Sequence, residues 1–369
     1  MKTIKNEYYS NKKIKEEHAH YNVLFGERSN GKTYQILYEI VENYLVKNKK
    51  GAIIRRWETD FSGQQGAGTC YNSLIENGKG VNVINELSGG QFNTVVYRGM
   101  CYYLATITDD GDIEKEKDPF CYGFAITKAE HYKMLALPMI TTILFDEFLT
   151  RQNYLPHEFE DFCSIVSSII RKRDDVTIWL CGNTVNQYSP YFREMGITKI
   201  KDMKQGTIDV YRYGESDLKV AVEYCESTNK KNKKKSDVYF AFDNPTLDMI
   251  KSGTWEFALY PKCPTKFRPK DIRLIYFINF SDVILQCEIV KSEEFNFTYI
   301  HEKTTPIKNE NDIVYSLEIS PRPYKYKNIL KGIDKVSKII TNYYMIDQVY
   351  YQDNTVGELM RNYLNECKR

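Results

Sequence analysis

The segment GERSNGKT, from Gly26 to Thr33, constrains the fold of this chain more than any other feature of its sequence. It matches the pattern G-x-x-x-x-G-K-[ST], follows the apolar run YNVLF and precedes an amphipathic stretch with helical spacing. Such a loop wraps its backbone N–H groups around a phosphate, and the N-terminus of the following helix adds positive potential. The sequence therefore predicts a strand, a phosphate-binding loop and a helix, with a nucleotide held by Gly26, Glu27, Arg28, Ser29, Asn30, Gly31, Lys32 and Thr33.

A second apolar run, TTILFDEF, leads into the acidic pair Asp146 and Glu147. In a phosphate-loop site, Lys32 reaches the β- and γ-phosphates, while the Thr33 hydroxyl and an acid after a neighbouring strand hold Mg²⁺. Asp146 is the candidate for that acid, and Glu147 is the candidate general base that polarises the attacking water. The alternative is a strand capped by two solvated acids. The loop and the acids together favour ATP and Mg²⁺ as ligands and hydrolysis as the chemistry.

Two more candidate positions follow the acidic pair. Asn183 ends the buried run IWLCGN, where a polar side chain can contact the γ-phosphate or the attacking water. Arg171 and Arg173 end the helix before that run, and an arginine there can enter a neighbouring subunit's site and stabilise charge on the transferring phosphoryl group. A loop asparagine and a favourable charge at a helix C-terminus explain the same residues without a catalytic role.

Buried strands alternate with amphipathic helices over the first half of the chain. This alternation predicts an α/β fold in which helices cover both faces of a parallel sheet. The stretch STNKKNKKKSD, residues 227–237, is rich in lysine and predicts an exposed linker. Beyond it, three apolar stretches between 272 and 302 predict consecutive antiparallel strands, and helical stretches follow at 325–345 and 355–368. We therefore expect an ATPase domain over 1–215, a linker over 216–240 and an α+β domain over 241–369.

The overall composition argues against several classes of protein. The net charge is only +2, so contacts with nucleic acid must come from local patches. None of the nine cysteines forms a Cys-x-x-Cys pair, which argues against a zinc ribbon or a thioredoxin-like site. The most apolar stretch, MLALPMITTILF, is short and contains Pro138, and there is no signal-peptide pattern. We expect a cytoplasmic protein without a membrane span.

The residues LSGGQ, from Leu87 to Gln91, match the signature of ABC-transporter ATPases. In those proteins the signature begins a helix shortly before the acidic strand. Here it lies far before Asp146 and is followed by FNTVVYRGMCYYLATI, an alternating stretch rich in β-branched and aromatic residues that favours strands. We therefore interpret residues 88–90 as a turn that enters a β-hairpin over 93–107.

The segments FGERSNGKT, IIRRW, TTILFDEF, YLP, IIRKRD, LCGN and SPYF, in this order, resemble the DNA-packaging ATPases, or encapsidation proteins, of the picovirins. These are small short-tailed phages with protein-capped linear genomes. The resemblance is specific over residues 20–195 and weaker beyond. It implies a P-loop ATPase of the ASCE class, of the terminase and FtsK/HerA kind. Such proteins form a ring, usually five-fold, at the portal vertex of an empty capsid, and they hydrolyse ATP to drive double-stranded DNA inward.

By position, the resemblance assigns the phosphate loop, the Mg²⁺ acid and the catalytic glutamate to the residues named above. It assigns Arg171 as an arginine finger that acts on a neighbouring subunit, with Arg173 as the weaker candidate. Arg55 and Arg56 match a basic pair after the second strand and are expected to contact nucleotide or a neighbouring subunit. The family often has a further basic residue just after that pair, where this chain has Glu58.

The resemblance also implies that the C-terminal domain is similar to a ribonuclease-H-like nuclease that has lost its chemistry. The first expected strand of that domain contains no acid, Asp282 falls at a turn and Glu288 lies on the next strand. Two-metal cleavage needs converging acids, so nuclease activity is not expected. We interpret the domain as a docking or nucleic-acid-binding module.

The implied partners are double-stranded DNA, the portal of the procapsid and further copies of the chain, with a packaging RNA in some relatives. The implied location is the host cytoplasm, with transient attachment to the portal vertex. Candidate DNA-gripping segments are the loops 60–70 and 109–118 and the lysine tract 230–235. The sequence leaves three alternatives open: a ring helicase or translocase of the FtsK/HerA kind, a nuclease-competent large terminase, and a nucleotide-regulated binding protein.

Overall fold

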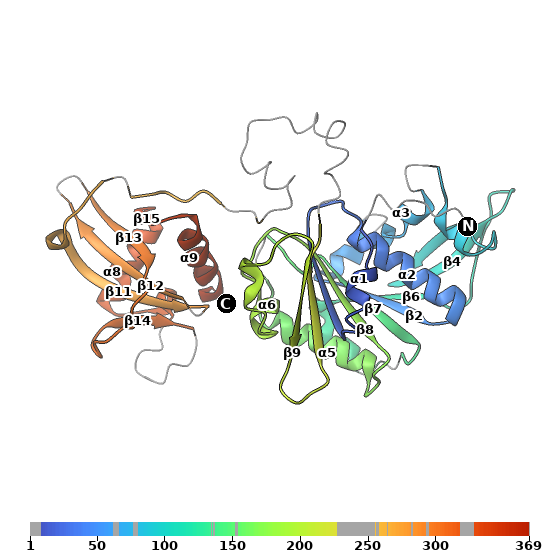
Figure 1. The fold of residues 1–369 in the computed structure, drawn as a ribbon. Helices are drawn as coiled ribbons and strands as arrows, with labels where there is room; N and C mark the ends of the chain where they lie inside the picture. Colours follow the sequence, from blue (N-terminus) through green and yellow to red (C-terminus); the bar gives the residue numbers. More distant parts are fainter. Residues whose placement is uncertain are drawn as a thin grey trace. The chain divides into compact units, whose positions relative to one another are not determined.

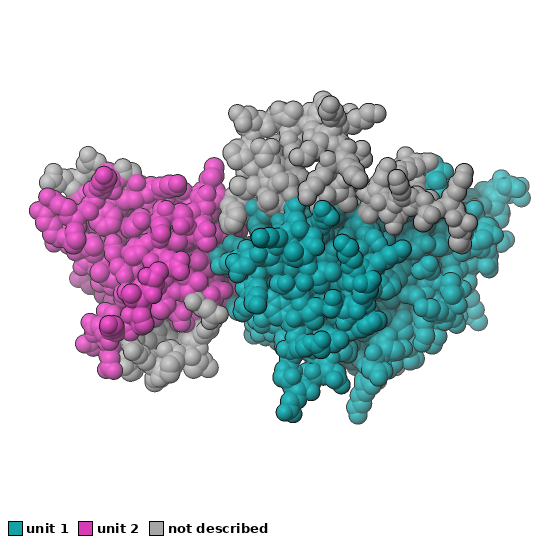
Figure 2. Space-filling model, in the orientation of Figure 1, with its two compact units in different colours: residues 1–256 teal, residues 257–369 magenta. Residues whose placement is uncertain are grey.

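The computed structural model describes residues 9–368 apart from several short segments and one long one. Within that range, the residues outside the description are 62–65, 77–79, 134, 136, 152–153, 227–254, 256–257, 264, 282, 293–294 and 318–327. The chain divides into two compact units, residues 1–256 and 257–369 (Figures 1 and 2). None of the helices in the described part is both long and apolar enough to cross a membrane.

A large sheet forms the centre of the first unit (Figure 1). Its strands follow the order β3-β4-β6-β2-β7-β8-β1-β10-β9, and β5 pairs with β4. The strands from β6 to β10 in that order run parallel, and the strands at either end pair antiparallel. The parallel run confirms the α/β part of the sequence prediction. The strand bounds are β1 Tyr21–Gly26, β2 Lys50–Arg55, β3 Thr94–Arg98, β4 Cys101–Ile107, β5 Ile113–Lys115, β6 Cys121–Ala125, β7 Ile140–Asp146, β8 Thr177–Asn183, β9 Thr207–Arg212 and β10 Lys219–Tyr224.

Helices cover both faces of this sheet, as the sequence predicted. Neighbouring residues of a strand point to opposite faces, so one strand shows which helix lies on each side. Leu144 of β7 belongs to the core that includes Ile40 of α2, whereas Phe145 stacks on Phe162 of α5 with ring centroids 5.3 Å apart. The helices of this unit are α1 Lys12–Lys15, α2 Lys32–Lys47, α3 Asn72–Ile75, α4 Val83–Leu87, α5 Glu158–Ile170 and α6 Pro190–Glu194, with 3₁₀ turns η1 Glu58–Phe61, η2 Gly66–Thr69, η3 Ile126–Tyr132 and η4 Lys199–Lys201.

The LSGGQ segment ends a short helix and does not begin one. Leu87 is the last residue of α4, and Gly89 and Gly90 have φ angles of +61° and +91°, a conformation that glycine adopts without strain. The chain then enters the hairpin of β3 and β4. This confirms the interpretation of the segment as a turn before a hairpin.

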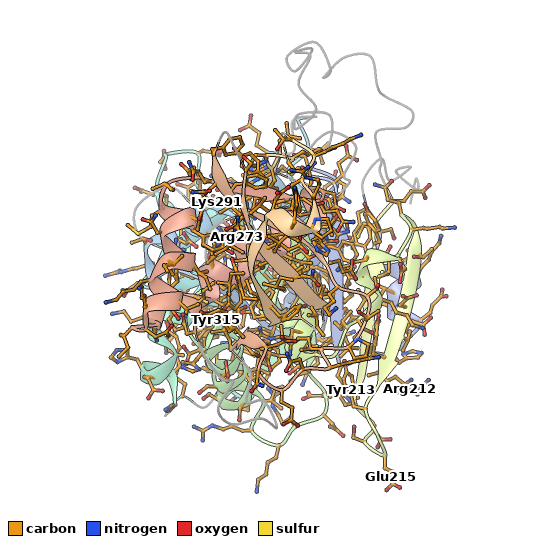
Figure 3. The ribbon with its side chains drawn as sticks, turned by 90° about the vertical axis from the view of Figure 1, so that its left-hand side faces the viewer. Arg212, Tyr213, Glu215, Arg273, Lys291 and Tyr315 are labelled. Carbon is orange, nitrogen blue, oxygen red and sulfur yellow. The ribbon has the colours of Figure 1, made fainter. Side chains whose placement is uncertain are left out.

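The first unit extends beyond residue 215, where the sequence analysis placed its end. The segment KVAVEY forms β10, which pairs with β1 in parallel, and Val220 and Val222 are buried. This apolar content gives a strand, so residues 219–224 are not part of a linker. Figure 3 labels Arg212, Tyr213 and Glu215 around the turn between β9 and β10. The lysine-rich stretch 227–237 lies outside the described residues.

A five-stranded sheet of order β14-β11-β12-β13-β15 forms the second unit. The three antiparallel strands β11, β12 and β13 confirm the prediction for residues 272–302, whereas β14 and β15 were not predicted. Arg273 lies on β11 and Lys291 ends β12 (Figure 3). One face packs on the helices, for example through Tyr276 and Tyr344, whose hydroxyls lie 2.7 Å apart. The bounds are β11 Ile272–Phe280, β12 Val283–Lys291, β13 Asn296–Glu302, β14 Ile313–Ser316, β15 Val349–Tyr351, α8 Lys335–Met345, α9 Asn354–Cys367, η7 Pro269–Asp271 and η9 Ile329–Lys331.

Candidate nucleotide-binding site

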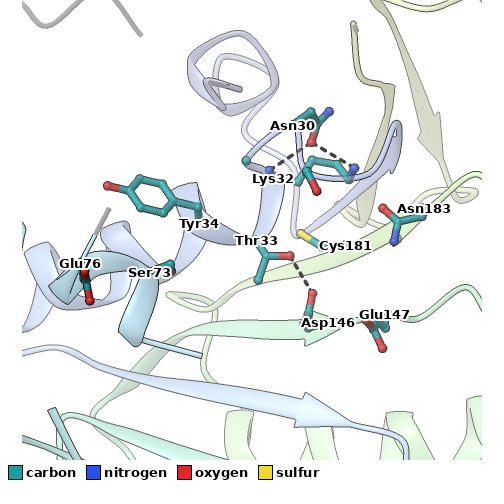
Figure 4. A pocket seen from close by; sticks show the side chains of 13 residues that line it. Asn30, Lys32, Thr33, Tyr34, Ser73, Glu76, Asp146, Glu147, Cys181 and Asn183 are labelled. Carbon is teal, nitrogen blue, oxygen red and sulfur yellow. Dashed lines mark hydrogen bonds between the residues drawn. The ribbon is translucent and has the colours of Figure 1, made fainter. Parts of the chain in front are cut away.

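A cavity of about 490 Å³ lies at the carboxyl ends of the central strands of the first unit (Figure 4). Parallel strands end at the same edge of a sheet, and this edge is where open α/β sheets bind ligands. The pairing of β1 with β8 places Gly26 opposite Asn183, and β7 ends beside them with Asp146. The cavity is lined by Ser29, Asn30, Gly31, Lys32, Thr33, Tyr34, Ser73, Glu76, Asp146, Glu147, Cys181, Gly182 and Asn183.

The sequence analysis predicted most of this lining. Five residues of the phosphate loop line the cavity, from Ser29 to Thr33, whereas Gly26, Glu27 and Arg28 of the same loop do not. Gly31 has a φ of +93° immediately before α2 begins, a backbone conformation that side-chain-bearing residues rarely adopt. The loop therefore has the path that a phosphate-binding loop requires, with the helix N-terminus facing the cavity.

The hydroxyl of Thr33 donates a hydrogen bond of 2.7 Å to Oδ1 of Asp146 (Figure 4). The two side chains come from the start of α2 and the end of β7, which are far apart in the sequence. A hydroxyl and a carboxylate oxygen are the ligand types that Mg²⁺ prefers in phosphate sites. The pair fits a Mg²⁺ ion that also binds substrate phosphates.

Lys32 is almost fully buried beneath the loop. Its Nζ donates to the carbonyl of Glu27 at 2.7 Å and to Oδ1 of Asn30 at 3.1 Å. An ammonium group has three donors, so one remains for a phosphate. Burial lowers the pKa of Lys32 from its ordinary value. An anionic phosphate in the cavity would favour the charged form again, which couples phosphate binding to the charge of this lysine.

Arg55 joins the two acids of the site. Its guanidinium contacts Oδ2 of Asp146 at 2.6 Å, Oε2 of Glu147 at 2.7 Å and Oδ2 of Asp60 at 3.3 Å. Burial disfavours the charged guanidinium, but the three carboxylates outweigh it and raise the pKa of Arg55. The sequence analysis expected this arginine to contact nucleotide or a neighbouring subunit, and the structure places it on the acids of its own chain. A cation bound by Asp146 would therefore have to compete with Arg55.

Arg56 does not take the position expected from the sequence, because its side chain does not line the cavity. It is buried and forms a two-point ion pair with Glu158, with both N–O distances 2.9 Å. It also donates to the carbonyl oxygens of Glu147 and Phe148, at 3.2 and 2.9 Å. Glu158 outweighs the effect of burial and raises the pKa of Arg56. Arg56 thus holds the backbone that carries the candidate general base.

Glu158, at the start of α5, completes this buried network. Its carboxylate also accepts hydrogen bonds from the backbone N–H of Leu155, at 2.7 Å, and from the Tyr191 hydroxyl, at 3.0 Å. Glu147 has a φ of +59°, an uncommon conformation for a residue with a side chain. The network stabilises that conformation, because Arg56 donates a hydrogen bond to the carbonyl of Glu147.

Arg171 and Arg173 differ in what they contact. Arg173 donates a hydrogen bond to the carbonyl of Ile140 at 2.6 Å and pairs with Asp175 at 2.9 Å. Its guanidinium is therefore bound by groups of its own chain. Arg171 is exposed, and its side chain donates a 3.3 Å hydrogen bond to the Ser168 carbonyl of the helix that it follows. Both follow α5 at the amino end of β7, about 20 Å of strand away from Asp146. Arg171 therefore cannot serve the cavity of its own chain.

Tyr34, Ser73 and Glu76 line the cavity but were not predicted from the sequence. Figure 4 shows Tyr34, Ser73 and Glu76 beyond Thr33, on the side away from Asn183. Tyr34 follows the loop motif directly, so its position was available from the sequence. Ser73 lies on α3 and Glu76 directly follows that helix, and no local pattern in the sequence predicts that they return to this cavity.

The chain resembles known phage proteins in sequence and in fold. No family model matches the sequence. The chain is 23% identical over 181 residues to a DNA packaging protein of Bacillus phage B103, a match that covers 48% of each protein. The DNA packaging protein of Bacillus phage phi29 is 23% identical over 178 residues, covering 46% of this chain and 45% of the relative. The chain spans about half the length of the curated relatives it matches.

Among solved structures, the Phi-28 gp11 DNA packaging motor aligns over 99% of both chains, with a TM-score of 0.55 and 16% identity. The bacteriophage Phi-29 viral genome packaging motor assembly aligns over 98% of both, also with a TM-score of 0.55. The chain therefore shares its fold with phage packaging motor proteins and is similar in sequence, over about half its length, to phage DNA packaging proteins.

Proposed function

We propose that this chain is the ATP-hydrolysing subunit of a ring motor that drives double-stranded DNA into a phage procapsid through the portal. The observation that carries the proposal is the contact between Thr33 and Asp146 beside Lys32, in a chain similar to DNA packaging proteins. The contact joins the phosphate loop and the acidic strand at one cavity, which is the arrangement of a phosphate-loop ATPase.

Each of these residues would have a different role in ATP hydrolysis. Lys32 would bind the β- and γ-phosphates, and Glu147 would accept a proton from the attacking water, with Asn183 orienting the water or the γ-phosphate. Thr33 and Asp146 would hold Mg²⁺, which neutralises charge on the phosphate oxygens when it is bound. Arg171, exposed at the opposite edge of the sheet, would act on the cavity of a neighbouring subunit.

Arg55→Ala is expected to lower the Mg²⁺ concentration needed for half-maximal ATP hydrolysis by several-fold. The guanidinium and the cation compete for Asp146, and removing one positive charge strengthens the attraction for the other. A titration of steady-state hydrolysis against Mg²⁺ measures this, and substitution of the exposed last residue of β3, Arg98→Ala, is the matched control. An unchanged or higher Mg²⁺ requirement for Arg55→Ala would show that Arg55 does not compete for Asp146.

Arg171→Ala is expected to lower hydrolysis by about 10³-fold or more, the usual effect of removing an arginine finger. Mixed with Glu147→Gln, it should regain activity, because an intact Glu147 and an intact Arg171 then meet at some subunit boundaries. Hydrolysis rates across mixing ratios measure this, and the exposed Lys172→Ala is the control. Loss of activity in every mixture would contradict a role in trans.

We propose that the second unit is a docking or nucleic-acid-binding module that resembles a ribonuclease-H-like domain without its chemistry. Its three antiparallel strands are followed by β14, which runs parallel to β11. Glu288 pairs with His301 at 3.4 Å, and the described residues contain no group of three metal-ligating side chains. Asp282 lies outside the described residues. Metal-dependent cleavage of plasmid DNA would instead support a nuclease-competent terminase.

The experiment that tests the function measures ATP hydrolysis with and without double-stranded DNA, together with the mass of the assembled particle. The proposal predicts hydrolysis that DNA stimulates and a particle of several copies. Strand displacement without a capsid would favour a FtsK/HerA-type helicase or translocase, and slow hydrolysis indifferent to DNA would favour a nucleotide-regulated binding protein. Portal binding, any packaging RNA and a location in the host cytoplasm remain parts of the same proposal.

A further inference from the structure

The tip of the β4–β5 hairpin presents an apolar pair surrounded by acids. Ile107 and Ile113 are paired across the two strands, and their side chains are 47% and 60% exposed. The turn is held by backbone hydrogen bonds of 2.9 Å between Thr108 and Asp112 and between Gly111 and Thr108. Four carboxylates surround the pair, those of Asp109, Asp110, Asp112 and Glu114, all exposed.

This tip does not suit the role of gripping DNA that the sequence analysis considered for residues 109–118. Carboxylates repel a phosphate backbone, and exposed isoleucines have nothing to bury against it. An apolar pair with a charged rim is instead typical of a protein contact, in which the apolar centre is buried and the rim sets specificity.

A complementary surface lies on α8 of the second unit. Ser337 and Ile340 are buried on the inner side of this helix. Its outer side is formed by other residues that lie three or four positions apart in the sequence. Ile339 and Met345 of α8 and Ile346, which directly follows it, are exposed, Met345 by 83%. A groove of about 570 Å³ runs along this side, lined by Ile333, Lys335, Lys338, Ile339, Asn342 and Tyr343.

Lys335 and Lys338, both exposed, line this groove, and the exposed Lys331 lies two residues before Ile333. The one acid within residues 331–339, Asp334, accepts hydrogen bonds from the backbone N–H and the hydroxyl of Ser337. Among the described residues, none of these lysines and none of the four hairpin carboxylates takes part in an ion pair. Nucleic acid would form ion pairs with the lysines but would leave the apolar residues exposed. A protein partner with an apolar centre and an acidic rim would pair with the lysines and also bury the apolar residues.

We infer that the acidic hairpin tip of one copy docks in the α8 groove of a neighbouring copy. The inference rests on the ring proposed above. A ring needs a head-to-tail interface, in which two different patches of the same chain meet. The hairpin and the groove are two such patches, with opposite charge and with apolar centres on each.

Charge reversal tests the contact. One variant combines Asp109→Lys, Asp110→Lys and Asp112→Lys, and the other combines Lys331→Glu, Lys335→Glu and Lys338→Glu. Exposed substitutions of this kind change fold stability little. Each variant alone should associate at least about tenfold more weakly than the unmodified chain, because like charges then face each other across the interface. Native mass measurement over a range of concentrations gives the association constant.

The mixture of the two variants is the decisive sample. Each copy then meets a partner with the complementary charge, so association should return in the mixture. If the contact formed within one chain, association would return only in a chain that carries all six substitutions and not in the mixture. That result would overturn the inference. If each of the two triple variants alone associated as strongly as the unmodified chain, the inference would be overturned but the proposal of a ring would not. Failure of the unmodified chain to associate, with hydrolysis intact, would overturn both the ring and the contact.

Discussion

Lys32→Ala is expected to abolish ATP hydrolysis and to leave the fold intact. Lys32 is the only lysine among the described residues that line the cavity, and the loss of one preorganised donor to the transferring phosphate is expected to lower kcat by about 10²–10³-fold or more. The variant also leaves the Glu27 carbonyl and Asn30 Oδ1 without this donor, which costs about 1–3 kcal/mol. Removal of a buried charge offsets part of that cost, since burial already lowers the pKa of Lys32.

Steady-state hydrolysis and thermal unfolding, measured on the same preparation, separate the two effects. Lys47→Ala, at the exposed C-terminal end of α2, is the matched control and should leave the rate unchanged. Hydrolysis at the normal rate by Lys32→Ala would show that the cavity is not the site of the reaction.

Glu158→Ala is expected to destabilise the first unit by about 3–5 kcal/mol, because it leaves the buried guanidinium of Arg56 without its partner. Urea unfolding measures the change in the free energy of unfolding. Glu160→Ala lies in the same helical turn but is exposed, and it should change stability by less than about 0.5 kcal/mol. An equal effect of the two substitutions would contradict the network described here.

The double variant Arg56→Met with Glu158→Leu separates stability from catalysis. Replacing a buried ion pair by apolar residues of similar size often restores stability. It does not restore the hydrogen bonds from Arg56 to the carbonyls of Glu147 and Phe148. The double variant should therefore regain most of the unfolding free energy and still show reduced kcat with a nearly unchanged KM. Full recovery of kcat would mean that Arg56 contributes only to stability.

The centre of the site was predictable because its signals are local. The glycine spacing around Lys32 and the apolar run before Asp146 each specify a strand end, and parallel strands bring such ends to one edge. The roles of Arg55 and Arg56 were not predictable from spacing. Arg55 ends β2 and Arg56 follows it, and adjacent residues of an extended chain point to opposite sides, so Arg55 reaches the cavity acids while Arg56 reaches Glu158 at the start of α5.

The end of the first unit could not be predicted from the sequence, for a different reason. KVAVEY is short, lies next to the lysine-rich stretch and has no loop signal that ties it to the first sheet. It becomes β10 because the edge of β1 accepts another parallel strand, which is a tertiary effect. In the same way, β14 and β15 are too short to stand out by composition and depend on the edges of a sheet already formed.

The most direct test of the packaging function is the fraction of double-stranded DNA that becomes resistant to nuclease when the chain, ATP, Mg²⁺ and procapsids are combined. We expect the unmodified chain to protect DNA, and we expect Glu147→Gln, which keeps the phosphate loop and Asp146, to bind ATP but to protect none. Equal protection by Glu147→Gln, or ATP hydrolysis by the unmodified chain with no DNA protected, would show that hydrolysis at this site does not drive packaging.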